Sequence, residues 1–328
     1  MSNSQKPGNK PDRSAFAGNA EAFREDFMLQ ASDYINVDLQ NLTGTTRFTW
    51  KASDGLTLSA NIWEPDNPRD PTVLCLPGLT RNTRDFFHLA NFLKENGLRV
   101  IAMDYRGRGH SDYSEDYESY SLEQEADDID RGIEALGLTQ FTLVGTSRGG
   151  LHSFSMAQRH PERLLSVIIN DIGPIIEPPA LDDIVTAVGT IMSQPSMKIA
   201  AERLAAIHGA TFTAMSDEDW ITFANQLYTP FSEGVTLRYD KRLGDTIRGE
   251  HKAAPEEDLW PSFNAMKPIP HLLLHGENSR LLSTNTVEMM QQHHENMELL
   301  TVPNQGHAPL LWDNLSQDRI LSFILKHA

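Results

Sequence analysis

The chain has 328 residues, and 39% of them are hydrophobic, which is enough to bury the core of two small domains or of one large domain with an insertion. Its formal net charge of -17 argues against nucleic acid and anionic membrane surfaces as partners, because both are polyanions that would repel it. A solvated acidic surface is the simplest explanation of this charge.

The single cysteine, Cys75, cannot form an internal disulfide, and it lies in the apolar run 72–76, where a buried thiol packs as a small hydrophobic group. No run of about 18 apolar residues is present, and the polar residues 1–13 lack the apolar stretch of a secretory signal. We therefore expect a cytoplasmic protein without stable membrane insertion.

Residues 1–40 read as a polar arm followed by a predicted helix at 21–32, without a catalytic motif. From residue 47 onward, strand and helix patterns alternate, which predicts a mostly parallel sheet of about eight strands with helices on both faces. The first two predicted strands form a hairpin closed by residues 53–55. The predicted strands are 47–51, 56–63, 72–76, 99–103, 141–144, 164–170, 271–275 and 298–302. The predicted helices are 83–96, 121–136, 148–157, 283–293 and 315–326.

The alternation stops between residues 173 and 268, where no strand pattern stands out. We interpret this segment as an inserted helical cap on an α/β core formed by residues 41–172 and 269–328. Ser216 with Asp219 three positions later is typical of a helix N-cap. The predicted cap helices are 181–192, 197–208, 216–228 and 255–266.

The cap contains six aromatic or sulfur-containing side chains that either line an apolar pocket or pack the cap's own core. They are Met192, Met215, Trp220, Phe223, Tyr228 and Phe231. Among them, Trp220 is our candidate for a substrate contact.

Residues 145–149 read Gly-Thr-Ser-Arg-Gly, a G-x-S-x-G pentapeptide with a predicted strand before it and a predicted helix after it. This arrangement is a nucleophile elbow, in which a sharp strand-to-helix turn exposes the Ser147 hydroxyl. The two glycines keep side chains away from the turn. The N-terminal amides of the following helix face any negative charge that develops at the serine.

Three further segments occur in order around the elbow: Leu-Pro-Gly-Leu at 76–79, Asp-Tyr-Arg-Gly-Arg-Gly-His-Ser at 104–111, and Asn-Gln-Gly-His-Ala-Pro at 304–309. They resemble the oxyanion turn, the D-x-R-G-x-G-x-S segment and the late histidine loop of the α/β-hydrolase family. From about residue 46 to its end, the chain resembles a member of that family with a helical cap. The resemblance implies the α/β-hydrolase fold, while the fold alone leaves the reaction open.

A serine hydroxyl is a poor nucleophile at neutral pH, so Ser147 needs a base, and histidine is the side chain whose ordinary pKa lies near the working range. Among the 12 histidines, His307 follows a late strand and comes last in the Ser-acid-His order expected of this fold. His110 lies in a loop with a structural role, and residues 293–294 mark an exposed helix end. His152, just past the elbow, is a weaker candidate for an orienting group or a pocket wall.

The oxyanion formed by attack of Ser147 needs preorganised donors, which backbone amides supply. We expect these to be the amides of Arg148 and Leu79. Pro77 stands where the family usually has histidine, so the bracing of this turn must differ. Arg81 either reaches the pocket mouth, where it favours an anionic substrate group, or pairs with a carboxylate at the surface.

The acid of the triad departs from the family pattern. After the predicted strand 271–275, the family commonly has G-x-x-D, but here Ser279 stands in the position of the aspartate. Serine cannot stabilise an imidazolium as a carboxylate does. Asp171 follows the preceding strand, which is a neighbour in this fold, and some relatives place the acid there. Asp171 is our first candidate, with Glu277 as the alternative and a turn cap as the structural role of Asp171.

These residues predict a cofactor-independent serine hydrolase, foremost of carboxylic esters, with a small-molecule ester or lactone as its partner. Ser147 argues against dehalogenase and epoxide hydrolase chemistry, because those relatives usually carry aspartate at the elbow. Lactonase, amidase, thioesterase and carbon-carbon bond hydrolase activities share the same triad and stay open. A non-catalytic receptor or scaffold is the alternative of another class. No histidine and carboxylate cluster has metal-ligand spacing, and the oligomeric state cannot be read from the sequence.

Overall fold

The computed structural model describes residues 44–253 and 258–328, which belong to one compact unit, Leu42–Ala328. The predicted arm over residues 1–40, with its helix at 21–32, lies outside the described residues. So do residues 254–257, with which the last predicted cap helix begins.

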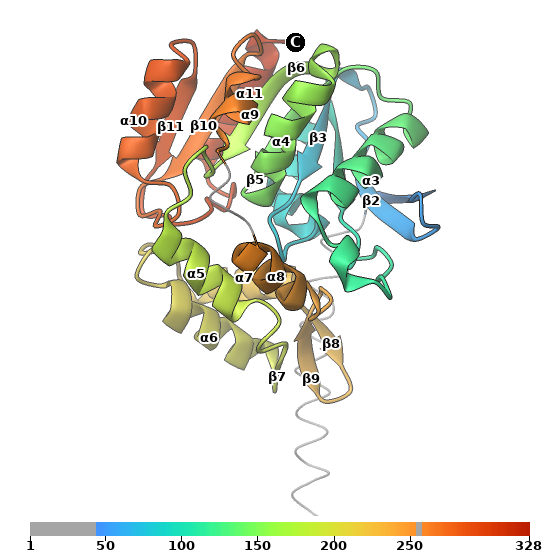
Figure 1. The fold of residues 1–328 in the computed structure, drawn as a ribbon, viewed down its shortest axis with the longest axis vertical. Coiled ribbons are helices and arrows are strands. Elements are labelled where there is room, and N and C mark those ends of the chain that lie inside the picture. Colours follow the sequence, from blue (N-terminus) through green and yellow to red (C-terminus); the bar gives the residue numbers. More distant parts are fainter. Residues whose placement is uncertain (1–43, 254–257) are drawn as a thin grey trace, which may run out of the picture. The chain divides into compact units, whose positions relative to one another are not determined.

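The main sheet of the described part has eight strands in the order β1-β2-β4-β3-β5-β6-β10-β11 (Figure 1). β1 and β2 form the predicted antiparallel hairpin, β2 is antiparallel to β4, and the other neighbouring strands are parallel. The mostly parallel sheet of about eight strands is therefore confirmed. The strands are β1 (Thr46–Lys51), β2 (Thr57–Trp63), β3 (Arg69–Leu76), β4 (Leu98–Asp104), β5 (Phe141–Thr146), β6 (Leu164–Asn170), β10 (His271–Gly276) and β11 (Glu298–Val302).

Helices cover both faces of this sheet because its central strands are apolar on both sides. In β3, Leu74 packs into the core on the side of α3, α4 and α10, while Val73 and Cys75 pack into the core on the side of α2 and α11. A strand buried on both faces reads as a continuous apolar run rather than as an alternating one. The helices are α2 (Phe87–Glu95), α3 (Leu122–Ala135), α4 (Arg148–Arg159), α10 (Thr284–His293) and α11 (Asn314–Lys326), with the 3-10 turns η2 (Thr83–Phe86), η3 (Tyr117–Ser119) and η4 (Pro161–Arg163).

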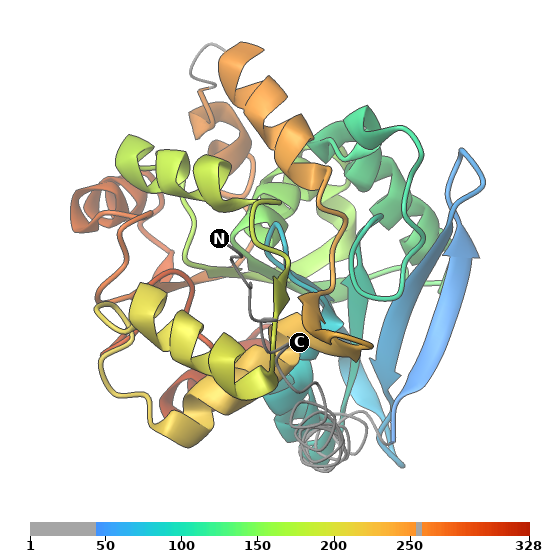
Figure 2. The same ribbon diagram turned by 90° about the horizontal axis from the view of Figure 1, so that it is seen from below.

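Between β6 and β10 lies the segment predicted as the cap, residues 173–268, and Figure 2 shows its helices in front of the sheet. Ser216 caps α7 as expected, in a capping box with Asp219. The prediction that this segment has no strand is wrong, since β7, β8 and β9 form a small antiparallel sheet. The elements of the cap are α5 (Pro178–Ala187), β7 (Ser193–Gln194), α6 (Met197–His208), α7 (Asp217–Leu227), β8 (Tyr228–Phe231), β9 (Gly234–Leu237), α8 (Leu243–Ala253) and α9 (Trp260–Asn264).

The errors in the cap have local causes. Strands of two to four residues, one of them containing Pro230, are too short to show the alternation by which a strand is recognised. α8 was missed because Gly244 and Gly249 weaken its helical pattern. Helix α5 begins at Pro178 and ends at Ala187, short of the predicted end at residue 192, because Gly189 adopts a positive φ of 77°.

The cap is joined to the core by hydrogen bonds at the end of α7. Arg84, in η2, donates from Nη1 to the carbonyl oxygens of Asn225 and Tyr228, at 2.8 and 3.2 Å. Asn82 donates to the carbonyl of Gln226, whose side chain in turn donates to the carbonyl of Arg84. A cation and amides thus satisfy carbonyl groups that the helix leaves free at its C-terminus. These bonds place α7 directly beside the loop that follows β3.

Candidate active site

The elbow is a strained turn between β5 and α4. Ser147 has φ 52° and ψ -111°, a conformation that L-residues rarely adopt and that costs about 1–3 kcal/mol. A Cβ on Gly145 would overlap the carbonyl of Gly149, and one on Gly149 would overlap the carbonyl of Leu76 in β3. The two glycines of the pentapeptide are therefore required by close backbone contacts, which let α4 start against β3.

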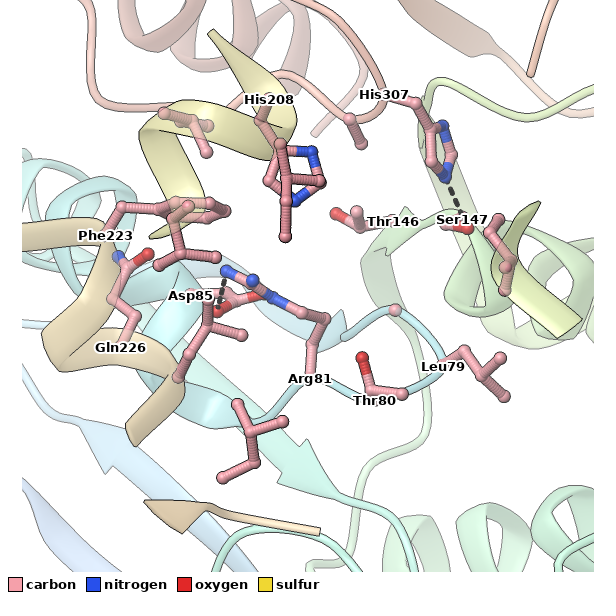
Figure 3. A pocket seen from close by; sticks show the side chains of 18 of the residues that line it. Leu79, Thr80, Arg81, Asp85, Thr146, Ser147, His208, Phe223, Gln226 and His307 are labelled. Carbon is pink, nitrogen blue, oxygen red and sulfur yellow. Dashed lines mark hydrogen bonds and ion pairs between the residues drawn. The ribbon is translucent and has the colours of Figure 1, made fainter. Parts of the chain in front are cut away.

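Ser147, His307 and Asp171 come together at the carboxyl ends of the strands. His307 Nε2 lies 2.9 Å from Ser147 Oγ, as the dashed line in Figure 3 marks, and His307 Nδ1 lies 2.8 Å from Asp171 Oδ2. His307 lies 160 positions from Ser147 and 136 positions from Asp171 in the chain, so the fold alone brings the histidine to the other two side chains. A hydroxyl bonded to an imidazole whose other nitrogen faces a buried carboxylate can act as a nucleophile in acyl transfer.

The carboxylate of Asp171 is fully buried and each of its oxygens is bonded. Oδ1 accepts from the Gly276 amide at 2.9 Å, and Oδ2 accepts from the Ser279 hydroxyl at 2.6 Å and faces His307. Ser279, which stands where the family commonly has its acid, thus holds the carboxylate that comes from the neighbouring strand. The pairing of β6 with β10 makes this contact possible.

Glu277, the alternative acid, lies elsewhere. Its side chain is exposed, and Oε2 accepts a hydrogen bond of 2.9 Å from the amide of Asn304. It closes the loop that leads to His307 without bonding to the imidazole. Among the described carboxylates, the imidazole of His307 is paired with Asp171.

The loop after β3 passes beside the serine. A methyl group on Gly78 would lie 3.8 Å from Ser147 Cβ, and the amide of Arg81 donates to the carbonyl of Gly78, which closes the turn. Two side chains of the 104–111 segment brace it: Tyr105 donates to the carbonyl of Pro77 at 3.0 Å, and Arg108 donates to the carbonyl of Leu79 at 2.9 Å. This bracing replaces the one expected from the histidine that Pro77 displaces.

A buried ion cluster lies behind the elbow. Glu125, on α3, faces Arg108 Nη2 through Oε1 at 2.8 Å and Arg148 Nε through Oε2 at 2.6 Å, and all three side chains are buried. Since Arg108 also holds Leu79, the cluster connects the loop after β3 to the first residue of α4. Burial alone would raise the pKa of Glu125, but the two guanidinium groups outweigh burial and hold it well below its usual range. Glu125 lies on the buried face of a predicted helix, but no motif in the sequence marks it as part of the site.

His152, the weaker candidate for an orienting group, belongs to this cluster. Its Nε2 lies 3.1 Å from Glu125 Oε2, and burial lowers its pKa although Glu125 opposes the shift. The pair at residues 293–294 is predicted only half correctly. His293 is exposed, but His294 is buried, stacked on Phe263 with a ring distance of 4.1 Å. The periodic pattern of α10 ends before His294, so the pattern carried no sign of its burial.

A cavity of about 370 Å³ lies between the core loops and the cap, with Ser147 and His307 in its wall (Figure 3). Most of the wall contributed by the cap is aliphatic or aromatic, which suits an apolar substrate group. The cap residues in this wall include Arg203, Leu204, Ile207, His208, Phe212 and Phe223.

Arg81 lines the cavity, but its charge is already paired. Nε and Nη2 donate to the two carboxylate oxygens of Asp85 at 2.6 and 2.8 Å, and the guanidinium lies 4.7 Å from the centre of the Phe223 ring. In Figure 3, Arg81 extends toward Asp85 and away from Ser147. The structure therefore combines both sequence interpretations, a pocket residue and a carboxylate partner.

Trp220 is not among the residues that line the cavity. It is buried, and its ring packs edge-on against Phe212 and Phe223, with ring distances of 6.4 and 6.1 Å. The candidate substrate contact at Trp220 is thus corrected: α7 turns Phe223 toward the cavity and Trp220 behind it. Trp220 supports the wall, and Phe212 and Phe223 form it.

Within residues 44–253 and 258–328, no group of three or more histidine, cysteine or acidic side chains is arranged to hold a metal ion. In the same part of the chain, no helix is both long and apolar enough to cross a membrane. Cys75 is a buried free thiol whose pKa is raised by burial.

The fold and the geometry of the elbow agree with a sequence-family match. Residues 71–314 match the family described as alpha/beta hydrolase fold, and the chain belongs to this family. Two relatives at least 30% identical to it over most of its length are hydrolases, and the protein is a hydrolase of the same fold.

Three known proteins show the degree of similarity. The 3-hydroxybutyrate-oligomer hydrolase of Cupriavidus necator is 32% identical over 260 residues, which cover 76% of this chain and 86% of that protein. The 2-(acetamidomethylene)succinate hydrolase of Mesorhizobium japonicum is 30% identical over 239 residues, covering 72% and 81%. The crystal structure of an alpha/beta hydrolase from Novosphingobium aromaticivorans has a TM-score of 0.82 and 34% identity, covering 87% of this chain and 99% of that one.

Proposed function

We propose that the protein is a serine hydrolase of carboxylic esters, with Ser147 as nucleophile, His307 as general base and Asp171 as the carboxylate that orients the imidazole. The observation that carries this proposal is the pair of hydrogen bonds, 2.9 and 2.8 Å long, that joins the three side chains. The carboxylate that orients an imidazole must be held in place. Asp171 is buried and both of its carboxylate oxygens are hydrogen-bonded, whereas Glu277 is exposed.

In the proposed reaction, Ser147 Oγ attacks the ester carbonyl carbon while His307 Nε2 takes its proton. The oxyanion of the tetrahedral intermediate accepts hydrogen bonds from the amides of Leu79 and Arg148. The bond from carbon to the alcohol oxygen then breaks, and the alcohol leaves with the proton from His307. Water, deprotonated by the same imidazole, attacks the acyl-enzyme and releases the acid and free Ser147. No cofactor takes part.

The cap, residues 173–268, is proposed to form the lid that covers the acyl-enzyme and selects the substrate. As substrate class we propose short aliphatic esters of hydroxy acids. Two observations support this class: a relative that is 32% identical acts on 3-hydroxybutyrate oligomers, and the cap wall of the cavity is largely apolar.

The proposal is tested by labelling the protein with a fluorophosphonate and by measuring turnover of p-nitrophenyl butyrate. We expect one label per chain at Ser147 and ester turnover, with both lost in Ser147→Ala. Labelling without turnover of any ester in a panel of aliphatic esters and lactones would favour the non-catalytic receptor instead. Turnover of lactones but not of open esters would move the assignment to lactonase on the same side chains.

A further inference from the structure

The cavity wall contains one charge that the described residues do not neutralise. Arg81 is paired with Asp85, and His307 faces Asp171. Arg203, which also lines the cavity, has no ion pair or hydrogen bond with any residue in the described part of the chain.

The other titratable groups of the wall are neutral near pH 7. Burial lowers the pKa of His208 to about 4, and the charges of Arg81 and His307 act in the same direction. Burial raises the pKa of the Tyr228 and Tyr239 hydroxyls, so neither becomes an anion that would pair with Arg203. The net charge that this wall offers to a substrate is therefore positive and is located at Arg203.

Helix α6 directs Arg203 to the cavity. Arg203 and Ile207 are four residues apart, as are Leu204 and His208, and residues at this spacing lie on the same face of a helix. Lys198 and Ile199, on the same helix, are exposed and are not part of the cavity wall. Arg203 is half-buried and Ile207 is 58% exposed, so this face of α6 is open both to the cavity and to solvent, and the guanidinium can meet a charged group that enters with a ligand.

We propose that Arg203 binds a free carboxylate of the substrate while Ser147 attacks an ester bond at the opposite wall. A guanidinium recognises a carboxylate through two parallel hydrogen bonds, which fix orientation as well as charge. The chain carries a formal net charge of -17 and repels anions at long range, so selection of an anionic ester needs a local cation of this kind.

This inference rests on the proposed ester hydrolysis and narrows its substrate class to an ester of a hydroxy acid whose carboxyl group is free. It also replaces Arg81 as the residue that favours an anionic substrate group, because Asp85 already occupies the guanidinium of Arg81. Arg203 is in this role a binding residue, and the chemistry stays with Ser147 and His307.

The test compares 3-(butanoyloxy)butanoate with its methyl ester, which lacks the negative charge and carries one more methyl group, and it measures release of butanoate from each. We expect kcat/KM of the wild-type protein to be at least tenfold higher for the free acid, mainly through a lower KM. Arg203→Gln brings this ratio close to one, and Arg203→Lys retains part of it. Lys198→Gln removes one positive charge from the exposed face of the same helix and keeps the wild-type ratio. Damage to folding lowers both rates together and does not change their ratio.

A wild-type ratio near one, or a ratio unchanged by Arg203→Gln, overturns the proposal while ester hydrolysis still holds. If neither ester is hydrolysed and Ser147 is not labelled by fluorophosphonate, the proposed function fails. In that case, calorimetry on the Ser147→Ala variant tests whether Arg203 binds the carboxylate, independently of any catalysis. Tighter binding of the free acid than of the methyl ester, lost on adding Arg203→Gln, supports the site, and equal binding overturns it.

Discussion

The two walls of the cavity differ in how their polar groups are bonded. On the core wall, Ser147, His307 and Asp171 are joined in one chain, and Ser279 and the Gly276 amide satisfy the remaining oxygens of the carboxylate. On the cap wall, most side chains are aliphatic or aromatic, and Arg203 has no ion pair or hydrogen bond with the described residues. The core wall is thus arranged to hold reacting groups in place, and the cap wall leaves contacts open for a ligand.

The backbone shows the same difference. Ser147 and Asp171 both adopt positive φ values, 52° and 59°, which are held because the surrounding strands are buried and paired. Strained conformations persist only where neighbouring structure determines them strongly. The cap has short elements, which are hydrogen-bonded to the core at the end of α7 and at residues 240–246. We therefore expect substitutions in the core wall to lower kcat, and substitutions in the cap wall to change selectivity.

The largest effect is expected for Asp171→Asn. Without the carboxylate, the imidazole is held in the wrong tautomer and its cation is not stabilised, so kcat should fall about 10⁴-fold. Glu277→Gln is the matched control and should keep the wild-type kcat. Steady-state kinetics with p-nitrophenyl butyrate measure both. A near-normal kcat for Asp171→Asn would show that another group orients His307.

The position of the acid is tested by moving it. Ser279 Oγ lies 2.6 Å from Asp171 Oδ2, next to the histidine, so a carboxylate at position 279 is close to the imidazole. In the Asp171→Asn background, Ser279→Asp should recover at least tenfold in kcat over Asp171→Asn alone. If the double variant folds but kcat does not recover, the loop after β10 cannot place an acid beside the imidazole of His307.

A smaller loss is expected for Glu125→Gln. Two buried guanidinium groups lose their common anion, and removal of one partner from a buried ion pair costs about 3–5 kcal/mol of stability. Because Arg108 holds Leu79, we also expect kcat to fall about 10- to 100-fold with little change in KM, less than the full loss of an oxyanion donor. Urea unfolding and kinetics well below the unfolding transition measure the two effects separately.

Asp128→Asn is the control for Glu125→Gln. Asp128 lies on the same helix and binds buried Arg106 at 2.6 Å, but this pair does not contact Leu79 or Arg148. The Asp128→Asn variant should be less stable than the wild-type protein and should keep the wild-type kcat. If both variants lose stability and neither loses activity, Glu125 has only a structural role.

The cap wall is tested by Ile207→Ala and its control Ile199→Ala, on the same helix but outside the cavity. Loss of about 40 Å² of apolar contact is equivalent to about 1 kcal/mol, or about a fivefold effect. The ratio of kcat/KM for hexanoate to acetate esters should fall by this factor in Ile207→Ala and stay constant in Ile199→Ala. A large fall in kcat for both esters would contradict the division between the two walls.

Histidines buried in the core and in the cap make the stability of the protein depend on pH. Burial lowers the pKa of six histidines, to about 3 for His110 and about 4 for His208 and His294, from an ordinary value near 6.5. The six are His88, His110, His152, His208, His271 and His294. Between pH 6.5 and 4, the unfolded chain binds protons that the folded chain does not, so stability falls as the pH decreases through this window.

Urea midpoints measured at pH 7 and pH 5 check this expectation. The midpoint should be lower at pH 5, and His294→Gln should weaken the dependence whatever its effect on absolute stability. A pH dependence that His294→Gln leaves unchanged would show that His294 binds a proton in the folded state.

Much of the core could be predicted from local sequence. Alternating strand and helix patterns predicted the eight strands, and the elbow was visible because its glycines, strand and helix are contiguous. The order of serine and histidine in the chain pointed to His307. The cap was harder to predict from the sequence, because β7, β8 and β9 are stabilised by pairing with one another and are too short to show a strand pattern of their own.

What the sequence by itself determined is therefore the family, the sheet and the two residues marked by local motifs, Ser147 and His307. Only the tertiary structure decided that Asp171 rather than Glu277 faces the imidazole, that Ser279 holds that carboxylate, and that Arg203 faces the cavity. The reason is physical: motifs and periodic patterns arise from contacts between residues near in the chain. The distance between loops more than 100 residues apart depends on which strands are neighbours and how the cap packs on them.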